Sequence, residues 1–240
     1  MHDSERTFDV KAGSAPYPVD VVSTAGPSIT TDRLVLRRWR DADRDPFAAL
    51  NADPDVMRYF LRPLDRDESD RLVDAVEASF ETDGVGQWAV ERRADGQFLG
   101  FTGLAPATFE ASFTPAIEVG WRFARSAWGH GYATEAGRAA LRYGFDVLSL
   151  DTILSWTAVL NLPSIAVMER LGMQRDPADD FDHPRIPPGH PLRRHVLYRL
   201  DRAEWLSRDP PDLATRGHPG RGWYPRQSPD QEIQAWLTAT

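Results

Sequence analysis

Short runs in which apolar residues occupy every second position predict the strands of a sheet, because side chains of a strand point to opposite faces in turn. In the first run, Leu34 and Leu36 hold these positions. Two later runs flank Ala94-Asp95-Gly96, a tripeptide typical of a hairpin turn. The expected strands are 33–37, 87–92, 98–104, 116–123, 152–159 and 195–200.

One strand carries an acidic side chain opposite its apolar residues. Ile117, Val119, Trp121 and Phe123 fall on one side of this strand, and Glu118 falls on the other. Two interpretations are open. Glu118 is either a candidate catalytic base or a solvent-facing or ion-paired strand residue.

Apolar residues recur at helical spacing between these strands. Leu72, Val76 and Phe80 repeat every four residues and predict an amphipathic helix that ends at Asp83-Gly84. A later helix has a narrow stripe of small residues, which indicates close packing against a sheet. The expected helices are 41–52, 53–60, 67–82, 131–148 and 163–171.

Hairpin strands come first and strands alternating with helices follow, so the sequence predicts a mixed α/β sheet in one domain. This domain spans residues 29–207, with residues 33–37 as the first strand of its core. A polar leader, residues 1–28, precedes it. A Pro- and Gly-rich extension, residues 208–240, follows and is poor in the apolar residues that order a segment.

The composition excludes several kinds of catalysis and binding site. The chain has 240 residues, no cysteine, and 28 lysines and arginines, of which only Lys11 is a lysine. Thiol catalysis, thiolate metal clusters, Schiff-base chemistry and a Walker-type phosphate loop are therefore excluded. The net charge of -8 argues against nucleic-acid binding. Because no apolar run is long enough to span a membrane and the N-terminus lacks a signal-peptide pattern, a cytoplasmic location is expected.

A glycine-rich turn between a strand and a helix is a candidate anion site. Gly129 and Gly131 flank His130 where the expected strand has ended and the next helix begins. Glycines let backbone amides approach a ligand closely, and the free N–H groups of a helix start favour a phosphate. Taken alone, the pattern fits an ordinary tight turn equally well.

The order of motifs around this turn resembles the GNAT superfamily of acyl-CoA N-acyltransferases. Trp128-Gly-His-Gly-Tyr-Ala-Thr-Glu-Ala is followed by Asn161-Leu-Pro-Ser and then by Met168-Glu-Arg-Leu-Gly-Met. The opening Thr31-Asp-Arg-Leu-Val-Leu-Arg is similar to the first strand of the RimJ/RimL-type branch, which is ribosomal-protein-N-acetyltransferase-like. The resemblance covers roughly residues 29–205 and implies the GNAT fold.

The resemblance implies acetyl-CoA as co-substrate and no metal. Amides of the turn would hold the pyrophosphate, with Arg125 or His130 assisting, and the end of the preceding strand would pair with the pantetheine arm. Asn161 would bond the same arm, although by residue type it is also a good helix cap. The expected cofactor-binding residues are Trp121, Phe123, Arg125, Trp128, Gly129, His130, Gly131, Tyr132, Ala133, Thr134, Asn161 and Ser164.

Acyl transfer to an amine requires the amine to be neutral, which favours a nearby base. Glu118 is the candidate base, since the family often has a carboxylate at that place. Many members protonate the leaving thiolate with a tyrosine, but Met168 stands at that spacing here. Ser164 is the nearest replacement and Tyr198 a distant one; Ser164 is equally a first-turn helix serine. Without cysteine, direct attack in a ternary complex is expected.

Three histidines lie close together in the sequence after residue 180. His183, His190 and His195 follow Asp179 and Asp180, a set that a metal site could use in principle. Their spacing across a Pro-rich stretch lacks the short two-ligand pair that nucleates a zinc site. We therefore expect a loop that borders the acceptor cleft, and no metal.

The acceptor is left open between two classes of primary amine. The branch includes enzymes for protein N-termini and relatives that act on polyamines or aminoglycosides. An α-amino group has a pKa of about 8 and a lysine amine one of about 10.4, so a modest base suits the former better. A protein or peptide N-terminus is the first expectation; a small amine, or a non-catalytic acyl-CoA-binding module, is the alternative. Relatives commonly form homodimers, and a dimer is possible here.

Overall fold

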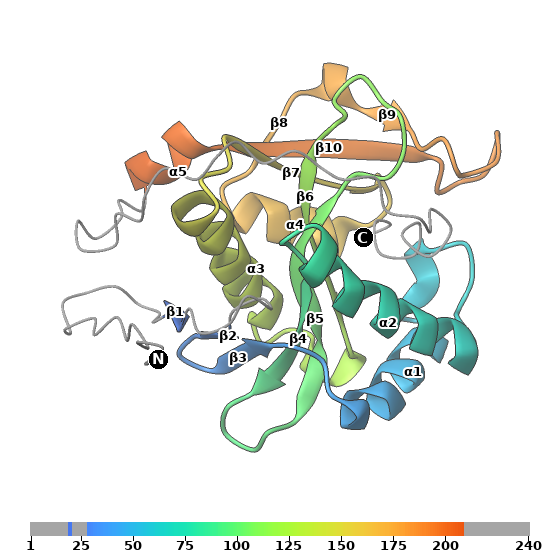
Figure 1. The fold of residues 1–240 in the computed structure, drawn as a ribbon. Helices are drawn as coiled ribbons and strands as arrows, with labels where there is room; N and C mark the ends of the chain where they lie inside the picture. The colour runs from blue at the N-terminus through green and yellow to red at the C-terminus, as the bar shows by residue number, and fades with distance from the viewer. Residues whose placement is uncertain (1–18, 21–27, 209–240) are drawn as a thin grey trace.

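The computed structural model describes residues 19–20 and 28–208, which build a mixed sheet with helices on both faces (Figure 1). The strands are β1 Val19–Asp20, β2 Ser28–Thr30, β3 Leu34–Arg37, β4 Gln87–Arg92, β5 Phe98–Pro106, β6 Ile117–Phe123, β7 Thr152–Ala158, β8 Gln174–Arg175, β9 Phe181–Asp182 and β10 Arg194–Asp201. Their order is β1-β2-β3-β4-β5-β6-β7-β10-β8, and β9 pairs with β10. The expected α/β class is confirmed.

Helices α1 (Arg44–Ala52) and α2 (Arg66–Thr82) cover one face of this sheet, and α3 (Tyr132–Arg142) and α4 (Leu162–Arg170) cover the other (Figure 1). On one face, Phe47 of α1 lies 5.9 Å, ring to ring, from Phe101 of β5. On the other, α3 packs so closely that a side chain at Gly137 would contact Trp121 of β6. The last described helix is α5 Arg202–Arg208, and there are 3-10 turns at Asp41–Asp43, Met57–Tyr59, Arg125–Ala127 and Pro177–Asp179, and a π turn at Tyr143–Val147.

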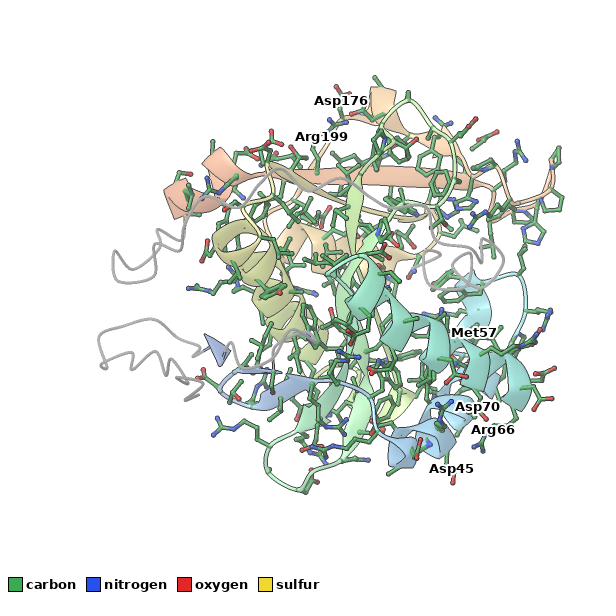
Figure 2. The ribbon with its side chains drawn as sticks, viewed as in Figure 1. Asp45, Met57, Arg66, Asp70, Asp176 and Arg199 are labelled. Atoms are coloured by element: carbon green, nitrogen blue, oxygen red, sulfur yellow. The ribbon has the colours of Figure 1, made fainter. Side chains whose placement is uncertain are left out.

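Helix α2 begins with a capping box. The side chain of Asp65 accepts from the Glu68 amide, and Glu68 accepts from the Asp65 amide. Arg66 follows, and its guanidinium bonds Asp45 of α1 at 2.6 Å and Asp70 of α2 at 2.7 Å (Figure 2). Because exposed ion pairs contribute little stability, the buried apolar stripe of α2 accounts for most of its attachment.

Most expected elements are present with shifted boundaries, but the helix expected over 53–60 is reduced to the 3-10 turn Met57–Tyr59. Residues 28–30 and 19–20 add two strands before the one expected first, so part of the N-terminal leader belongs to the sheet. The helix expected over 131–148 ends at Arg142 and continues as the π turn. The rest of the leader and residues 209–240 lie outside the described residues. Among the described helices, none combines the length and apolar character needed to cross a bilayer.

Strands β6 and β7 separate in the middle of the sheet. They run parallel, and the described ladder between them consists of one pair, Glu118 with Leu154. Toward Phe123 and Ala158, each strand pairs with its other neighbour, β5 or β10. Two parallel strands that pair at one point and then diverge leave a wedge-shaped opening, with Glu118 at its vertex.

Candidate active site

A cavity of about 560 Å³ lies at this opening. Its walls come from the Met57–Tyr59 turn and its neighbours, the end of β6, the turn before α3, and α4 with the residue that caps it. Most of the expected cofactor residues line it: Trp121, Phe123, Trp128, Gly129, Gly131, Tyr132, Ala133, Thr134, Asn161 and Ser164. The structure thus brings together motifs that are far apart in the sequence.

The glycine turn leaves backbone donors directed at the cavity. Gly129 and Gly131 have φ of 78° and 79°, a left-handed conformation that side chains rarely adopt. Gly131 is the N-cap of α3, and no side chain caps this helix. The first helical bond joins the Glu135 amide to the Gly131 carbonyl at 3.1 Å, so the amides of residues 132–134 precede the ladder. These groups and the positive end of the helix dipole are chemically suited to bind an anion.

A clamp formed by Thr31, Arg33 and Glu135 fixes this turn to the start of β3. The Thr31 hydroxyl donates to Glu135 Oε1 at 2.5 Å, and the Arg33 amide donates to the same oxygen at 3.0 Å. Arg33 Nε donates to Glu135 Oε2 at 2.6 Å, and Arg33 Nη1 to the His130 carbonyl at 2.9 Å. The opening motif and the glycine motif therefore act as one unit.

Two residues expected to assist phosphate binding lie away from the cavity. Arg125 forms an ion pair with Asp55, and the His130 ring lies 5.5 Å from the Tyr132 ring. Neither of the two lines the cavity. Trp128 does, and its indole N–H donates to the Phe123 carbonyl at 2.9 Å.

The arginines that do line the cavity are Arg58, Arg122 and Arg170, none of which is among the expected site residues. A signal for Arg122 was available, because it stands four residues after Glu118 on the same strand and hence on the same face. For Arg58 and Arg170 the sequence offered no comparable signal.

Asn161 and Ser164 meet at the start of α4. Asn161 Oδ1 accepts from the Ser164 amide at 3.3 Å, and Asn161 Nδ2 donates to Thr157 Oγ1 at 2.9 Å. The helix-cap interpretation of Asn161 is confirmed, and the residue also lines the cavity. The Ser164 hydroxyl has no hydrogen-bond partner among the described residues. Tyr198 is not part of the lining, and its hydroxyl donates to Glu169 at 3.3 Å.

Glu118 is completely buried, at the vertex of the β6–β7 opening, and is not one of the residues that line the cavity. Its side chain is 0% exposed, and neither carboxyl oxygen has a hydrogen-bond partner among the described residues. Burial raises the pKa of Glu118 well above its usual range. The solvent-facing or ion-paired interpretation is therefore wrong. The side chain shares a face with its ladder partners Ala105 and Leu154, which is the face covered by α1 and α2.

Two of the three histidines form a buried pair. The rings of His183 and His195 lie 5.0 Å apart, and His183 packs against Phe109 at 4.7 Å. Burial lowers the pKa of His183 to about 3 and that of His195 to about 4. Within residues 28–208, no group of three or more His, Cys, Asp or Glu side chains is arranged to hold a metal ion.

The loop that carries the histidines borders the cavity. Ile186 and Leu192 pack with Tyr59, and Tyr59 belongs to the cavity wall. The expected position of this loop beside the cleft agrees with these contacts.

Comparisons with known proteins agree with this geometry. Residues 33–174 match the family described as acetyltransferase (GNAT) domain. The chain is 33% identical over 213 residues to the FsC-acetyl coenzyme A-N(2)-transacetylase of Aspergillus fumigatus, covering 84% of this chain and 88% of that protein.

Solved structures show the same fold. The GNAT-family acetyltransferase of Bacillus anthracis is similar with a TM-score of 0.61 and 25% identity, over 74% of this chain and 99% of its own. Spermidine N-acetyltransferase of Vibrio cholerae, solved with CoA and spermine, has a TM-score of 0.58 and 20% identity over 72% and 98% of the two chains. Family match, fold and cavity together show that the chain belongs to the GNAT family of acetyl-CoA-dependent N-acetyltransferases.

Proposed function

We propose that the protein acetylates the α-amino group of a protein or peptide N-terminus, by direct attack on acetyl-CoA within a ternary complex. The observation that most supports this is the opening between β6 and β7, which has an anion-binding turn at one end and the Glu118 carboxyl at its vertex. The bound thioester supplies the electrophilic carbonyl carbon. A nitrogen–carbon bond forms as the carbon–sulfur bond breaks, the amine loses one proton, and the thiolate gains one.

The turn would hold the pyrophosphate through the amides of residues 129–134. Beyond Glu118, β6 has no ladder partner on its β7 side, so its backbone groups are available to the pantetheine amides. The Phe123 carbonyl is the exception, because the Trp128 indole already donates to it. These interactions direct the thioester toward the vertex.

Glu118 is proposed as the base. A raised pKa brings the carboxyl closer to the pKa of an α-amine, about 8, and makes proton transfer between them easier. Ser164 is proposed as the proton donor to the departing thiolate, because the residue lines the cavity and its buried hydroxyl has no hydrogen-bond partner among the described residues.

The charges of the cavity support an α-amine over a polyamine. Among its described lining residues the only acid is Asp55, which is already paired with Arg125, whereas three are arginines. A polycation needs carboxylates for recognition and is repelled by guanidinium groups. A position in the RimJ/RimL-type branch, supported by the opening motif at residues 31–37, belongs to the same proposal.

A small amine is the second candidate. The Vibrio cholerae spermidine enzyme shares the fold, and the name of the Aspergillus fumigatus relative specifies an N(2) position. A panel of Ser-, Ala- and Met-starting peptides, spermidine and an aminoglycoside, assayed by release of the CoA thiol, separates the candidates. We expect turnover with the peptides; turnover with spermidine or the aminoglycoside alone would refute the N-terminal assignment.

A further inference from the structure

A buried arginine lines the cavity from the face of β6 opposite to α3. Arg122 and Glu118 point to the same face of β6, the face covered by α1 and α2. Arg122 is 4% exposed and lines the cavity. The α3 helix, which begins at the anion-binding turn, packs on the opposite face beside Trp121. An acceptor that approaches the thioester from the side opposite the cofactor phosphates therefore meets Arg122.

A chain of buried polar groups holds Arg122 in place. Arg122 Nη1 donates to Asn51 Oδ1 at 2.7 Å, and Asn51 Nδ2 donates to Ser69 Oγ at 3.0 Å. Asn51 and Ser69 are both 0% exposed. The chain runs from α2 through α1 to β6, so the packing of both helices determines where the guanidinium lies.

An aromatic ring fixes the plane of the guanidinium. The Phe60 ring centroid lies 4.1 Å from Arg122 Cζ, and Phe60 also lines the cavity. The stacking on Phe60 and the hydrogen bond to the Asn51 side chain leave the guanidinium little rotational freedom. Burial lowers the pKa of Arg122 to about 9, so the group is still a cation at neutral pH. A buried cation destabilises the folded protein, so the presence of Arg122 at this position favours a functional role for it.

We propose that Arg122 determines acceptor specificity by binding the carbonyl or carboxylate oxygen next to the acceptor's amino group. The inference rests on the proposed function and names the group of the acceptor that the site recognises, which is the oxygen of the α-carbonyl group. An arginine fork donates well to such oxygens and disfavours a second ammonium group nearby. Spermidine has no such oxygen and carries additional positive charge.

The direct test compares an alanyl peptide with isopropylamine, which keeps the amine and the methyl group of alanine but has a second methyl group in place of the carbonyl and the rest of the peptide. The wild type is expected to have a higher kcat/KM for the peptide, and Arg122→Met to reduce that preference about 10- to 100-fold. The KM for acetyl-CoA is expected to change less than about twofold. Arg142→Met is the matched control, because Arg142 is also buried but lies on α3 beside Trp205, outside the cavity lining.

Asn51→Asp supplies a second variant that keeps the arginine. The new carboxylate would pair with Arg122 and compete with the acceptor oxygen, so the preference is expected to fall in the same direction. Equal losses for both acceptors, an unchanged preference, or a rise confined to the KM for acetyl-CoA would overturn the inference.

Binding affinities measured by calorimetry test the role of Arg122 without requiring turnover. The CoA-bound wild type is expected to bind the acetylated alanyl peptide at least tenfold more tightly than N-isopropylacetamide, and Arg122→Met is expected to lose this difference. If no amine is acetylated, the proposed function fails while this measurement still decides the role of Arg122. Equal binding of the two compounds by the wild type would contradict the inference.

Discussion

At the scale of single residues, Glu118 combines two properties that oppose each other in a base. Burial at the vertex of the β6–β7 opening makes its carboxylate more basic, since the charged form has lost its hydration. The same burial means that the carboxylate exists only at pH values above the raised pKa. We therefore infer that the rate increases with pH through that pKa.

A pH profile tests this at the residue scale. When kcat/KM is calculated from the concentration of the neutral amine alone, the titration of the acceptor is removed and an acid limb reports the enzyme. We expect this limb well above about 4.3, the value of an ordinary glutamate, and expect Glu118→Gln to lack it. A wild-type rate that stays constant down to about pH 4.3 would exclude Glu118 as the base.

At the scale of elements, the start of β3 orients the N-terminus of α3. Glu135 accepts from Thr31 and from both the backbone and the side chain of Arg33, and its side chain is only 9% exposed. Arg33 also donates to the turn itself, at the His130 carbonyl. Helix amides bind a phosphate only when they are held in place, so the clamp should contribute to cofactor affinity.

Breaking this clamp should weaken the binding of acetyl-CoA without slowing the acyl transfer itself. Glu135→Gln and Arg33→Ala are expected to raise the KM for acetyl-CoA about 5- to 20-fold, which corresponds to one or two charge-assisted hydrogen bonds in a half-exposed setting. The KM for the amine and kcat should change little. Arg66→Ala, which breaks one ion pair between α1 and α2 and one within α2, is the control. A fall in kcat with an unchanged KM for acetyl-CoA would contradict the role given to the clamp.

The sequence predicted those parts of the site that local chain geometry determines. Two glycines at left-handed φ angles define the turn at Gly129-His130-Gly131, and alternation placed Glu118 opposite Val119. The burial of Glu118 was not predictable, because residues outside its own strand cover its face. Phe109, which follows β5, and Leu197 of β10 belong to the same cluster as its ladder partner Leu154.

The short strands and the cavity arginines were missed for a related reason. Two-residue strands such as β1, β8 and β9 have no periodicity of their own and form because a longer strand is already beside them. Arg58 and Arg170 line the cavity only because the Met57–Tyr59 turn and α4 meet across it. The single ladder pair between β6 and β7 likewise depends on the whole sheet.

At the scale of the whole molecule, the buried histidine pair links stability to pH. His183 and His195 have folded-state pKa values lowered to about 3 and about 4, against about 6.5 in an unfolded chain. Below about pH 6.5 the unfolded state takes up protons that the folded state does not, so stability falls as the pH falls. Glu118 acts in the opposite sense, since its folded pKa is raised, and one carboxyl offsets only part of the effect of two histidines.

The variant His183→Gln measures how much His183 contributes to the pH dependence of stability. The variant should be less stable than the wild type at pH 7.5, and the gap should narrow by up to about 1.4 kcal/mol for each pH unit between about 6 and 4. Urea unfolding at several pH values measures the gap. A gap that stays constant over this range would mean that His183 is protonated in the folded protein.

The measurement that bears most directly on the mechanism is CoA-thiol release from acetyl-CoA with an Ala-starting peptide. Glu118→Gln should lower kcat about 10²- to 10⁴-fold with the KM for acetyl-CoA within about threefold of the wild type. It should fold normally, since it removes a carboxyl whose burial costs stability above about pH 4.3. Asp83→Asn is the matched control, because Asp83 is also a buried carboxyl with a raised pKa but is the C-cap of α2 and belongs to neither β6 nor β7. Wild-type kcat in Glu118→Gln, or an equal loss in Asp83→Asn, would contradict the assignment of Glu118 as the base.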